Sequence, residues 1–559
     1  MSPAPRYLVR EIALPAVAAI DAAREREALP KAVAEYLRLP AKAVEDIRIV
    51  RKSLDARARN RPVWRYAVEF SSPRPLKHPR VTIVGGAVAP AVSSASASAS
   101  TSAAGASGEA GITRHALPGR NIALVGSGPA GLAATLGLSR KGYKVTVFEI
   151  GKGVVERFRD IRRHIKQNIL DTKSNILFGL GGAGTFSDGK LTARTRNAYT
   201  DTFLKDLVAC GSDPSIEFLH HPHIGTDKLQ FIVDKYRVLC EEAGANFRFE
   251  TEVVDLILEN GRCVGVEADH RGVRESARFD AVVIAPGLSA HAFYRALHAR
   301  GVAMEPKAFA VGVRVEHPQE LINARQLGDR VDAKVTGAAE YFLTWQNDSG
   351  DAAYSFCMCP GGVIVPCADA EHALFTNGMS YSNRGSAFAN SAVVAAVSPE
   401  RLQKLYPGDI LAGVTYQRDL ERRAYTLGGG DGTFPAQTIA AFVEGRVDEG
   451  PLWKTSFQKP LRWANFHDLF DKEVAAALRD SFRDFERKIP GFIAKGLMIG
   501  PESRTSSPVR IPRDPETLES VNIPGLYPLG EGAGYSGGIV SSGADGVRFA
   551  DAVKACHVG

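Results

Sequence analysis

The stretch NIALVGSGPAG, residues 121–131, decides the fold of this chain. Its first five residues form an apolar run that predicts a short buried strand, and its glycines have the G-x-G-x-x-G spacing. The first glycine permits a tight turn, the second lets the backbone approach a pyrophosphate, and the third allows a helix to pack closely on the strand. A helix that begins here directs free N–H groups at the phosphates. The predicted cofactor contacts of this turn are Gly126, Gly128, Pro129, Ala130 and Gly131.

The acidic residue that such a site needs follows at the expected place. Residues 144–148 predict the second strand, and Glu149 stands at its end. A carboxylate at this point accepts hydrogen bonds from ribose hydroxyls. The alternative is an accidental glycine turn in a structural βαβ unit. Here, however, the expected elements follow one another at the right spacing: a strand, the turn, a helix, a second strand and the acidic residue. We therefore predict a dinucleotide site.

A second glycine-rich turn, near the C-terminus, indicates which dinucleotide is bound. The sequence GEGAG, residues 530–534, follows a short apolar segment and precedes a predicted helix over 539–554. Such a turn brings N–H groups and a helix N-terminus towards the flavin pyrimidine, where negative charge develops on reduction. We therefore predict FAD rather than a nicotinamide cofactor. The predicted contacts of this segment are Gly530, Glu531, Gly538 and Ile539.

A third glycine cluster, residues 179–184, precedes the polar run TFSDGK that ends at Lys190. Glycines suit close approach of backbone to a flat ring system, although a packing loop is the alternative. Lys190 is a candidate catalytic residue, as a charge beside the flavin. The remaining predicted cofactor contacts are Gly182, Gly184, Thr185, Ser187, Val254 and Gly287.

Composition divides the chain into domains. Residues 91–111 are almost wholly Ala, Ser, Thr and Gly, which predicts a flexible linker. The strand–glycine turn–helix pattern of the N-terminal half returns near Gly525, so we expect an α/β fold in which a Rossmann-like FAD-binding domain is assembled from two chain segments. The predicted divisions are an N-terminal α+β module (1–90), a linker (91–117), the first FAD-binding segment (118–304), an inserted α+β substrate or cap domain (305–495) and a C-terminal FAD-binding segment (496–559).

The N-terminal module is predicted to contain strands over 7–14, 47–54 and 63–70 and a helix over 16–37. Arginines and a lysine gather between residues 51 and 65. They could bind RNA, but without interleaved exposed aromatic residues a solvated strand face is the favoured interpretation.

Whole-chain properties exclude several classes of protein. The 559 residues are 45% hydrophobic and 23% charged, as in globular proteins, and the net charge of +7 is mild. No run of about 18 apolar residues exists, so we expect no membrane span. Seven cysteines without a dense disulfide pattern favour a reducing, cytoplasmic compartment.

Several longer motifs resemble the poorly characterised bacterial FAD-dependent dehydrogenase family. They are RKSLDAR (51–57), GGAGTFSDGK (181–190), CMCPGG (357–362) and the segments 502–511 and 530–546. The resemblance covers nearly the whole chain and extends to the wider glutathione-reductase-like FAD superfamily. It implies FAD and an oxidoreductase activity but no particular substrate. The Ala/Ser-rich linker is a departure, as is Glu531, where the superfamily often has aspartate; a carboxylate there can still accept from the ribityl chain.

Cys357 and Cys359 are further candidate catalytic residues, because on a strand they would share one face. They could be a redox pair or a thiolate beside the flavin. With Cys367 and His372 they could bind a metal, but the spacing matches no standard zinc pattern. Buried free cysteine usually behaves as a small hydrophobic residue, so we favour a packing role and predict no metal site.

Two other polar groups are candidates. His220, His221 and His223 could contact substrate or cofactor, although a loop role is favoured. Arg504 is the last candidate catalytic residue, since a guanidinium could polarise a substrate carboxylate or a flavin carbonyl; an ordinary surface turn is the alternative.

We therefore expect an FAD-dependent oxidoreductase that moves a hydride between the flavin and a small organic substrate. The segments 83–86 and 428–432 do not make a second nucleotide fingerprint, so NADH or NADPH would visit the flavin only as a transient electron donor. The alternatives are a flavin-dependent RNA-modifying enzyme that uses the basic N-terminal module and a non-catalytic FAD-binding protein. We expect a small-molecule substrate, no nucleic acid and no membrane partner.

Overall fold

The computed structural model describes residues 5–19, 21–58, 60–84, 114–192 and 196–556 of the chain. The predicted linker at 91–111 lies outside the described residues. Contacts divide the chain into two compact units. The smaller unit contains the N-terminal module together with Phe218–His220 and Arg330–Thr336, and the larger unit contains the rest.

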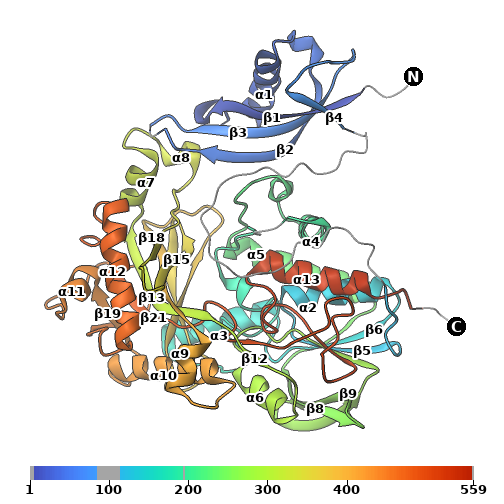
Figure 1. The fold of residues 1–559 in the computed structure, drawn as a ribbon, viewed down its shortest axis with the longest axis vertical. Coiled ribbons are helices and arrows are strands. Elements are labelled where there is room, and N and C mark those ends of the chain that lie inside the picture. The colour runs from blue at the N-terminus through green and yellow to red at the C-terminus, as the bar shows by residue number, and fades with distance from the viewer. Residues whose placement is uncertain (1–4, 20, 59, 85–113, 193–195, 557–559) are drawn as a thin grey trace. The chain divides into compact units, whose positions relative to one another are not determined.

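The larger unit contains a parallel sheet of five strands in the order β23-β11-β5-β6-β7. Two of them, β5 and β6, are labelled in Figure 1. Every neighbouring pair in this sheet runs parallel, so the carboxyl ends of all the strands lie at one edge. The strands are β5 (Asn121–Val125), β6 (Lys144–Phe148), β7 (Asn246–Arg248), β11 (Ala281–Ile284) and β23 (Leu526–Pro528). Because β23 comes from the far end of the chain, the prediction of a Rossmann-like domain assembled from two segments is confirmed.

Two helices from opposite ends of the chain cross in close backbone contact within this domain. They are α2 (Pro129–Arg140) and α13 (Ile539–Ala552). A Cβ atom on Gly546 would lie 2.2 Å from the carbonyl oxygen of Ala130, so only glycine permits this approach. The domain also contains α3 (Val154–Gln167), α4 (Ala198–Ala209), α5 (Thr226–Glu242), α6 (His291–Ala299) and a 3-10 turn η3 (Ala183–Phe186).

A three-stranded antiparallel sheet is inserted between β7 and β11. Its strands are β8 (Thr251–Glu259), β9 (Arg262–His270) and β10 (Val273–Arg278). A register shift between Val253 and Asp255 takes Val254 out of the regular cross-strand pairing with β9.

A second sheet, of seven strands in the order β14-β15-β18-β13-β21-β19-β20, forms the inserted domain. Its central strand β13 (Phe309–Pro318) is buried at every position except the last, and it pairs with β18 at one edge and with β21 at the other. The other strands are β14 (Thr344–Gln346), β15 (Ala352–Cys359), β18 (Phe388–Val397), β19 (Phe434–Thr438), β20 (Leu461–Trp463) and β21 (Leu497–Glu502).

The boundary predicted at residue 496 is therefore too early. Strand β21 pairs with β13 and β19 and belongs to the inserted sheet. The next strand, β22 (Val509–Arg510), pairs instead with β12 (Glu305–Pro306). The apolar run of β21 resembles a Rossmann strand in the sequence, and only its pairing partners show which sheet it joins.

Helices and a hairpin complete the inserted domain, and Figure 1 shows α12 alongside the strands of the large sheet. The elements are α7 (Gln319–Leu327), α9 (Pro399–Leu405), α10 (Ala412–Leu427), α11 (Ile439–Glu444), α12 (Lys472–Lys488) and the paired strands β16 (Gly362–Cys367) and β17 (Phe375–Ser380).

The smaller unit is a four-stranded antiparallel sheet, order β2-β3-β1-β4, covered by one helix. Its edge strand β2 is extended by Phe218–His220: the amide of Lys52 donates to the Phe218 carbonyl and the amide of His220 donates to the Lys52 carbonyl, each at 2.9 Å. The elements are β1 (Arg6–Pro15), α1 (Ala22–Leu37), β2 (Glu45–Asp55), β3 (Val63–Ser71), β4 (Val81–Val84) and, from the later segment, α8 (Ala333–Thr336).

The sequence prediction for this unit was wrong in two places. The helix predicted over 16–37 begins only at Ala22, because the carboxylate of Asp21 accepts from the amide of Arg24 at 2.8 Å and caps it there. Residues Ala16–Ala19 form a separate 3-10 turn. Strand β4 was not predicted. Among the described residues, no helix combines the length and the apolar character needed to cross a membrane.

Candidate functional site

The glycine turns lie together at the carboxyl edge of the parallel sheet, one after β5, one after β11 and one after β23. A Cβ atom added at Gly128, Gly287 or Gly538 would meet no protein atom within 4 Å, so these three backbones border open space. Gly131 is the opposite case, since its Cβ would lie 2.0 Å from the carbonyl oxygen of Gly126. The turns thus form a cradle, bordered by bare backbone, that fits a dinucleotide.

Two helix N-termini open on this cradle. Helix α2 begins after Gly128 and α13 begins after Gly538, and neither helix has a side-chain cap. Their first N–H groups are therefore available to a phosphate or to an electron-rich ring. Pro129 at the start of α2 lacks an N–H that the helix would not use, and it holds the backbone in the helical conformation.

The carboxylate of Glu149 joins three segments around the cradle. One oxygen accepts from the amide and the hydroxyl of Ser127, at 3.0 and 2.5 Å. The other accepts from the amides of Gly151 and Gly179, at 2.9 and 3.0 Å. Glu149 thus connects the phosphate turn, the end of β6 and the third glycine cluster. Its contact with a ribose stays a prediction.

Arg157, which the sequence analysis missed, organises the third glycine cluster. The side chain is fully buried in α3, and its five N–H groups donate to five main-chain carbonyls at 2.7–3.2 Å. No carboxylate is among these partners, and burial lowers the pKa of Arg157 to about 9. The carbonyls belong to Asn175, Ile176, Gly179, Leu180 and Gly182. A buried arginine on a helix face was the available signal, but its partners could not be inferred from spacing.

The loop after this cluster contacts the cradle. A Cβ atom on Gly184 would lie 3.0 Å from Cγ1 of Ile539, at the start of α13. The hydroxyl of Thr185 donates to the carbonyl of Leu180 at 3.2 Å, and that of Ser187 donates to the carbonyl of Gly184 at 2.7 Å. Pro129, Gly184, Thr185 and Ile539 also line a small apolar pocket with side chains of α4 and α5. These predicted cofactor residues are therefore brought together.

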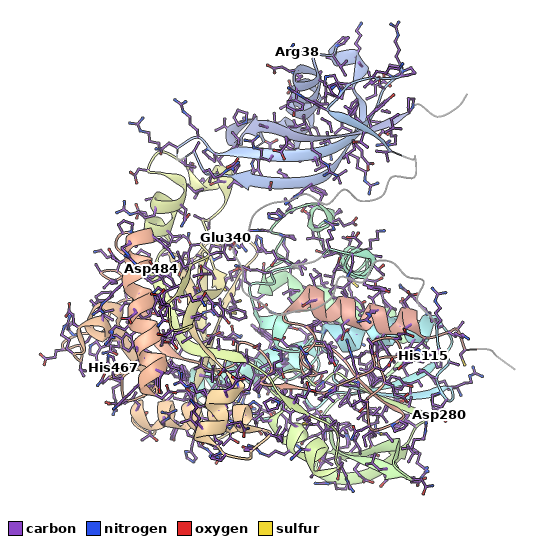
Figure 2. All side chains as sticks on the ribbon, in the orientation of Figure 1. Arg38, His115, Asp280, Glu340, His467 and Asp484 are labelled. Carbon is purple, nitrogen blue, oxygen red and sulfur yellow. The ribbon has the colours of Figure 1, made fainter. Side chains whose placement is uncertain are left out.

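Further along the same loop, charged side chains meet in a group that we call the Lys190 cluster. The Lys190 ammonium donates to the carbonyl of Met358 and lies 3.4 Å from the carboxylate of Glu340. Nδ1 of His221 is hydrogen-bonded to the same carboxylate at 2.5 Å. The members of the cluster are Asp188, Lys190, His221, Glu340 and Arg384, and Glu340 is labelled in Figure 2.

Electrostatics within the Lys190 cluster keep Glu340 ionised. Burial alone would raise the pKa of Glu340, but the hydrogen bond from His221 and the charge of Lys190 outweigh it and lower the pKa to about 2. Asp188 is buried and pairs with Arg384 at 2.8 Å and with the hydroxyl of Ser380. Neither Glu340 nor Arg384 was a candidate in the sequence analysis, because each lies far along the chain from Lys190. His223 lies nearby, hydrogen-bonded to the carbonyl of Ser382 at 3.2 Å.

Cys357 and Cys359 end strand β15 beside the Lys190 cluster. The regular alternation that would put both on one face does not hold, because the register with β18 shifts between Phe356 and Cys359 and Cys357 has a φ of +46°. The thiol of Cys359 donates to the carbonyl of Cys357 at 3.3 Å. Nη2 of the fully buried Arg314 reaches the same carbonyl at 2.8 Å and the Cys359 sulfur at 3.3 Å.

The two thiols are electrostatically different. The side-chain interaction with the Cys359 thiol, followed by the charges of Arg314 and Lys190, lowers the pKa of Cys357 to about 6. The same interaction between the two thiols, together with burial, raises the pKa of Cys359 well above the usual value. Burial also raises the pKa of Glu531, in the C-terminal turn of the cradle, to about 7, and Cys357 contributes to that rise.

The other two residues considered with these cysteines lie in different surroundings. Cys367 is buried in β16, where its thiol donates to the carbonyl of Val365 at 3.8 Å, and His372 packs its ring on Tyr425. Within the part of the chain that the structure describes, no group of three or more His, Cys, Asp or Glu side chains is arranged to hold a metal.

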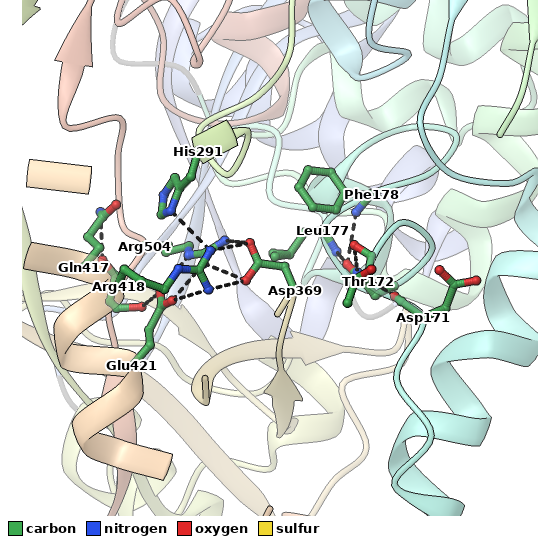
Figure 3. A network of polar contacts seen from close by, with 12 residues as sticks. Asp171, Thr172, Leu177, Phe178, His291, Asp369, Gln417, Arg418, Glu421 and Arg504 are labelled. Carbon is green, nitrogen blue, oxygen red and sulfur yellow. Dashed lines mark hydrogen bonds and ion pairs between the residues drawn. The ribbon is translucent and has the colours of Figure 1, made fainter. Parts of the chain in front are cut away.

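Arg504 is neither on a surface turn nor free to bind a substrate. It is buried, and its guanidinium pairs with Asp369 at 2.7 Å and with Glu421 at 2.7 Å (Figure 3). Arg418 of α10 shares Asp369 at 2.8 Å, and His291 lies beside this network. All three guanidinium nitrogens of Arg504 donate to these two carboxylates, so its role is to tie the segment after β21 to α10. The proposal of a catalytic Arg504 is therefore withdrawn.

Comparisons with known proteins agree with this architecture. Residues 120–327 match the family model described as pyridine nucleotide-disulphide oxidoreductase, and residues 308–505 match the model of the FAD-dependent protein C-terminal domain. Residues 11–71 match a domain of unknown function. An uncharacterised protein of Clostridium beijerinckii is 38% identical over 432 residues, which cover 77% of this chain and 79% of that protein.

The solved structures that match are more distant in sequence. A geranylgeranyl bacteriochlorophyll reductase-like protein from Thermoplasma acidophilum is 12% identical, with a TM-score of 0.33 over 77% of each chain. CtdE in complex with FAD is 12% identical, with a TM-score of 0.28 over 77% of this chain and 82% of that one. Together with the bare-backbone cradle, the two family models confirm FAD as the predicted cofactor.

Proposed function

Because this chain belongs to a family of FAD-dependent oxidoreductases, we propose that it transfers a hydride between the flavin and a small organic substrate bound beside the Lys190 cluster. The observation that carries the proposal is the hydrogen bond from Lys190 to the carbonyl of Met358. It joins the loop that contacts α13 to the end of β15, and so links two segments that lie far apart in the sequence.

The chain's own residues would perform binding, orientation and proton handling. FAD, when bound, supplies the group that accepts or donates the hydride. The N-terminus of α2 would hold the pyrophosphate, and that of α13 would stabilise negative charge on the pyrimidine side. His221, held by an ionised Glu340, is suited to carry a proton to or from the substrate. Lys190 would orient a substrate oxygen.

We further propose that NADH or NADPH delivers electrons transiently. The match to pyridine nucleotide-disulphide oxidoreductases over residues 120–327 supports such a donor. The glycines at 428–432 follow helix α10 rather than a strand, which argues against a resident nicotinamide site there. A donor that visits the flavin face needs no second Rossmann turn.

An RNA-modifying activity is less well supported. In the N-terminal module, Lys52 pairs with Glu25 at 2.6 Å, and Arg57 and Arg65 both pair with Asp55, at 2.7 and 3.3 Å. These cations are balanced by acids of the same module, whereas a phosphate-binding face presents unbalanced ones. We therefore infer a small-molecule substrate and no nucleic-acid partner.

Anaerobic stopped-flow mixing tests the proposal. The oxidised holoprotein is mixed with NADH and with NADPH, and the reduced flavin is then mixed with candidate carbonyl and enoyl compounds. We expect one donor to bleach the flavin and Lys190→Met to slow reoxidation by substrate with FAD content unchanged. Lys205→Met, which alters an exposed lysine of α4, serves as the control. A flavin that no donor reduces would favour a non-catalytic role.

A further inference from the structure

Cys357 differs from the other cysteines of the described residues. Five of them are buried, and only Cys357 and Cys556 are partly exposed. Cys357 is two residues from a second thiol, that of Cys359, and the charges of Arg314 and Lys190 act on it. Cys556 follows the last helix, where its amide donates to the carbonyl of Lys141 at 2.8 Å. Cys556 is therefore an internal control for the reactivity of the Cys357 thiol.

The backbone around Cys357 is held in an unusual conformation. A φ of +46° is costly for a residue with a side chain, so surrounding contacts must maintain it. Arg314 and the Cys359 thiol both donate to the Cys357 carbonyl, and Lys190 donates to the carbonyl of the next residue, Met358. These three hydrogen bonds fix the position of Cys357 relative to Cys359.

The charges that face this pair favour an anion. Arg314 is fully buried in β13, and its one carboxylate partner among the described residues is Glu502, at 3.3 Å. Burial raises the pKa of Glu502 to about 7, so that near neutral pH this carboxylate balances Arg314 only in part. From the other side come two pairs of opposite charge, Lys190 with Glu340 and Arg384 with Asp188. A thiolate at Cys357 supplies the negative charge that Glu502 leaves missing beside Arg314.

We propose that Cys357 is a peroxide-reactive thiolate and that Cys359 is its resolving thiol. Accessible thiolates with low pKa values beside a second cysteine are the cysteines that hydroperoxides oxidise first. The ligand class is therefore a hydroperoxide, with hydrogen peroxide as its simplest member.

The chemistry balances in two steps. The Cys357 thiolate attacks the terminal oxygen of the peroxide, a sulfur–oxygen bond forms and the oxygen–oxygen bond breaks. The sulfur loses two electrons to the peroxide, whose other oxygen leaves as hydroxide or alkoxide and takes up a proton. The Cys359 sulfur then attacks the sulfenic acid, a disulfide forms, and water leaves with the Cys359 proton. Oxidation removes the thiolate and leaves Arg314 with Glu502 as its only anion.

Trapping with dimedone tests this proposal on the holoprotein with oxidised FAD. The protein is exposed to hydrogen peroxide, and its peptides are identified by mass spectrometry. In Cys359→Ser we expect a sulfenic acid–dimedone adduct at Cys357. The parent protein should instead yield the Cys357–Cys359 disulfide and lose two thiols per chain. Cys556 should react on the order of tenfold more slowly.

The role of the charges is tested separately by alkylation with iodoacetamide across pH. The rate at Cys357 should be half-maximal near pH 6 in the parent protein. Lys190→Met should move this midpoint to higher pH, and Arg314→Lys should keep it near its original place. If Arg314→Lys loses FAD, the pH midpoint of the parent protein and its shift in Lys190→Met still test the proposal. Equal rates at Cys357 and Cys556, or an adduct at Cys359 instead, would overturn the proposal.

Discussion

The buried guanidinium of Arg157 donates through Nη2 to the carbonyl oxygen of Gly182 at 2.9 Å. Four further carbonyls of the same loop accept the other N–H groups of this arginine. The loop therefore folds around a single side chain from α3, and Gly182 lies on the loop's side towards the cradle, with its ideal Cβ 3.3 Å from Cα of Gly128. The side chain of Arg157 therefore supports the loop that borders the cradle.

Replacing Arg157 with Met should leave these carbonyls without donors and lower the free energy of unfolding by at least about 3 kcal/mol. Thermal unfolding and the bound FAD-to-protein ratio measure the effect. Arg163→Met, which alters an exposed arginine of the same helix, should change neither. An Arg157→Met protein with full FAD and unchanged stability would contradict the assigned role.

Gly128 and Gly131 should respond differently to added side chains. Gly128→Leu should abolish FAD binding while the apoprotein stays folded, because its Cβ enters the open space of the cradle. Gly131→Ala should destabilise the protein itself, since its Cβ collides with the carbonyl of Gly126. Flavin fluorescence titration and circular dichroism distinguish the two outcomes. FAD bound at normal affinity by Gly128→Leu would rule out this placement of the pyrophosphate.

Arg504→Met should destabilise the protein strongly, by about 3–5 kcal/mol, because it leaves the buried carboxylates of Asp369 and Glu421 without their main partner. Denaturant unfolding gives the magnitude. At a temperature where the variant is folded, its rate of flavin reduction should match that of the parent. A selective loss of rate with normal stability would restore a catalytic role to Arg504.

Stability should depend on Glu340 at acid pH. Its pKa is lowered on folding to about 2 from 4.5, so the unfolded chain binds the proton more readily. The stabilisation is therefore complete above about pH 4.5 and is lost as the pH falls towards 2. Glu340→Gln should show a shallower decline in the denaturation midpoint over this range. Glu473→Gln, at an exposed position, should follow the parent curve.

Removal of the N-terminal module should leave FAD binding intact. Every residue of the cradle lies in the larger unit, and none belongs to the smaller one. A protein that starts near Leu117 should bind FAD with the parent affinity, measured by fluorescence titration. Some loss of solubility is expected, because Phe218–His220 would lose their partner strand β2. Loss of FAD from a folded truncated protein would place the module within the cofactor site.

The sequence by itself determined the elements whose chemistry is local. The spacing of Gly126, Gly128 and Gly131 specifies a tight turn between a strand and a helix, and such a turn depends only on residues a few positions apart. The assembly of the FAD-binding domain from two chain segments was likewise predicted, because apolar strands stand beside glycine turns in both segments. FAD could be predicted because two such turns, far apart in sequence, each had a recognisable local form.

The tertiary structure alone decided which charged residues belong together. Arg157, Arg314 and Glu340 have no motif, because each acts on groups brought near by the closure of long loops. Arg504 shows the reverse: a polar run suggested an exposed candidate, whereas folding buried it against Asp369 and Glu421. The spacing of residues along the chain specifies the local backbone conformation. A buried charge, in contrast, needs a partner because burial removes its water, and burial occurs only when distant segments pack together.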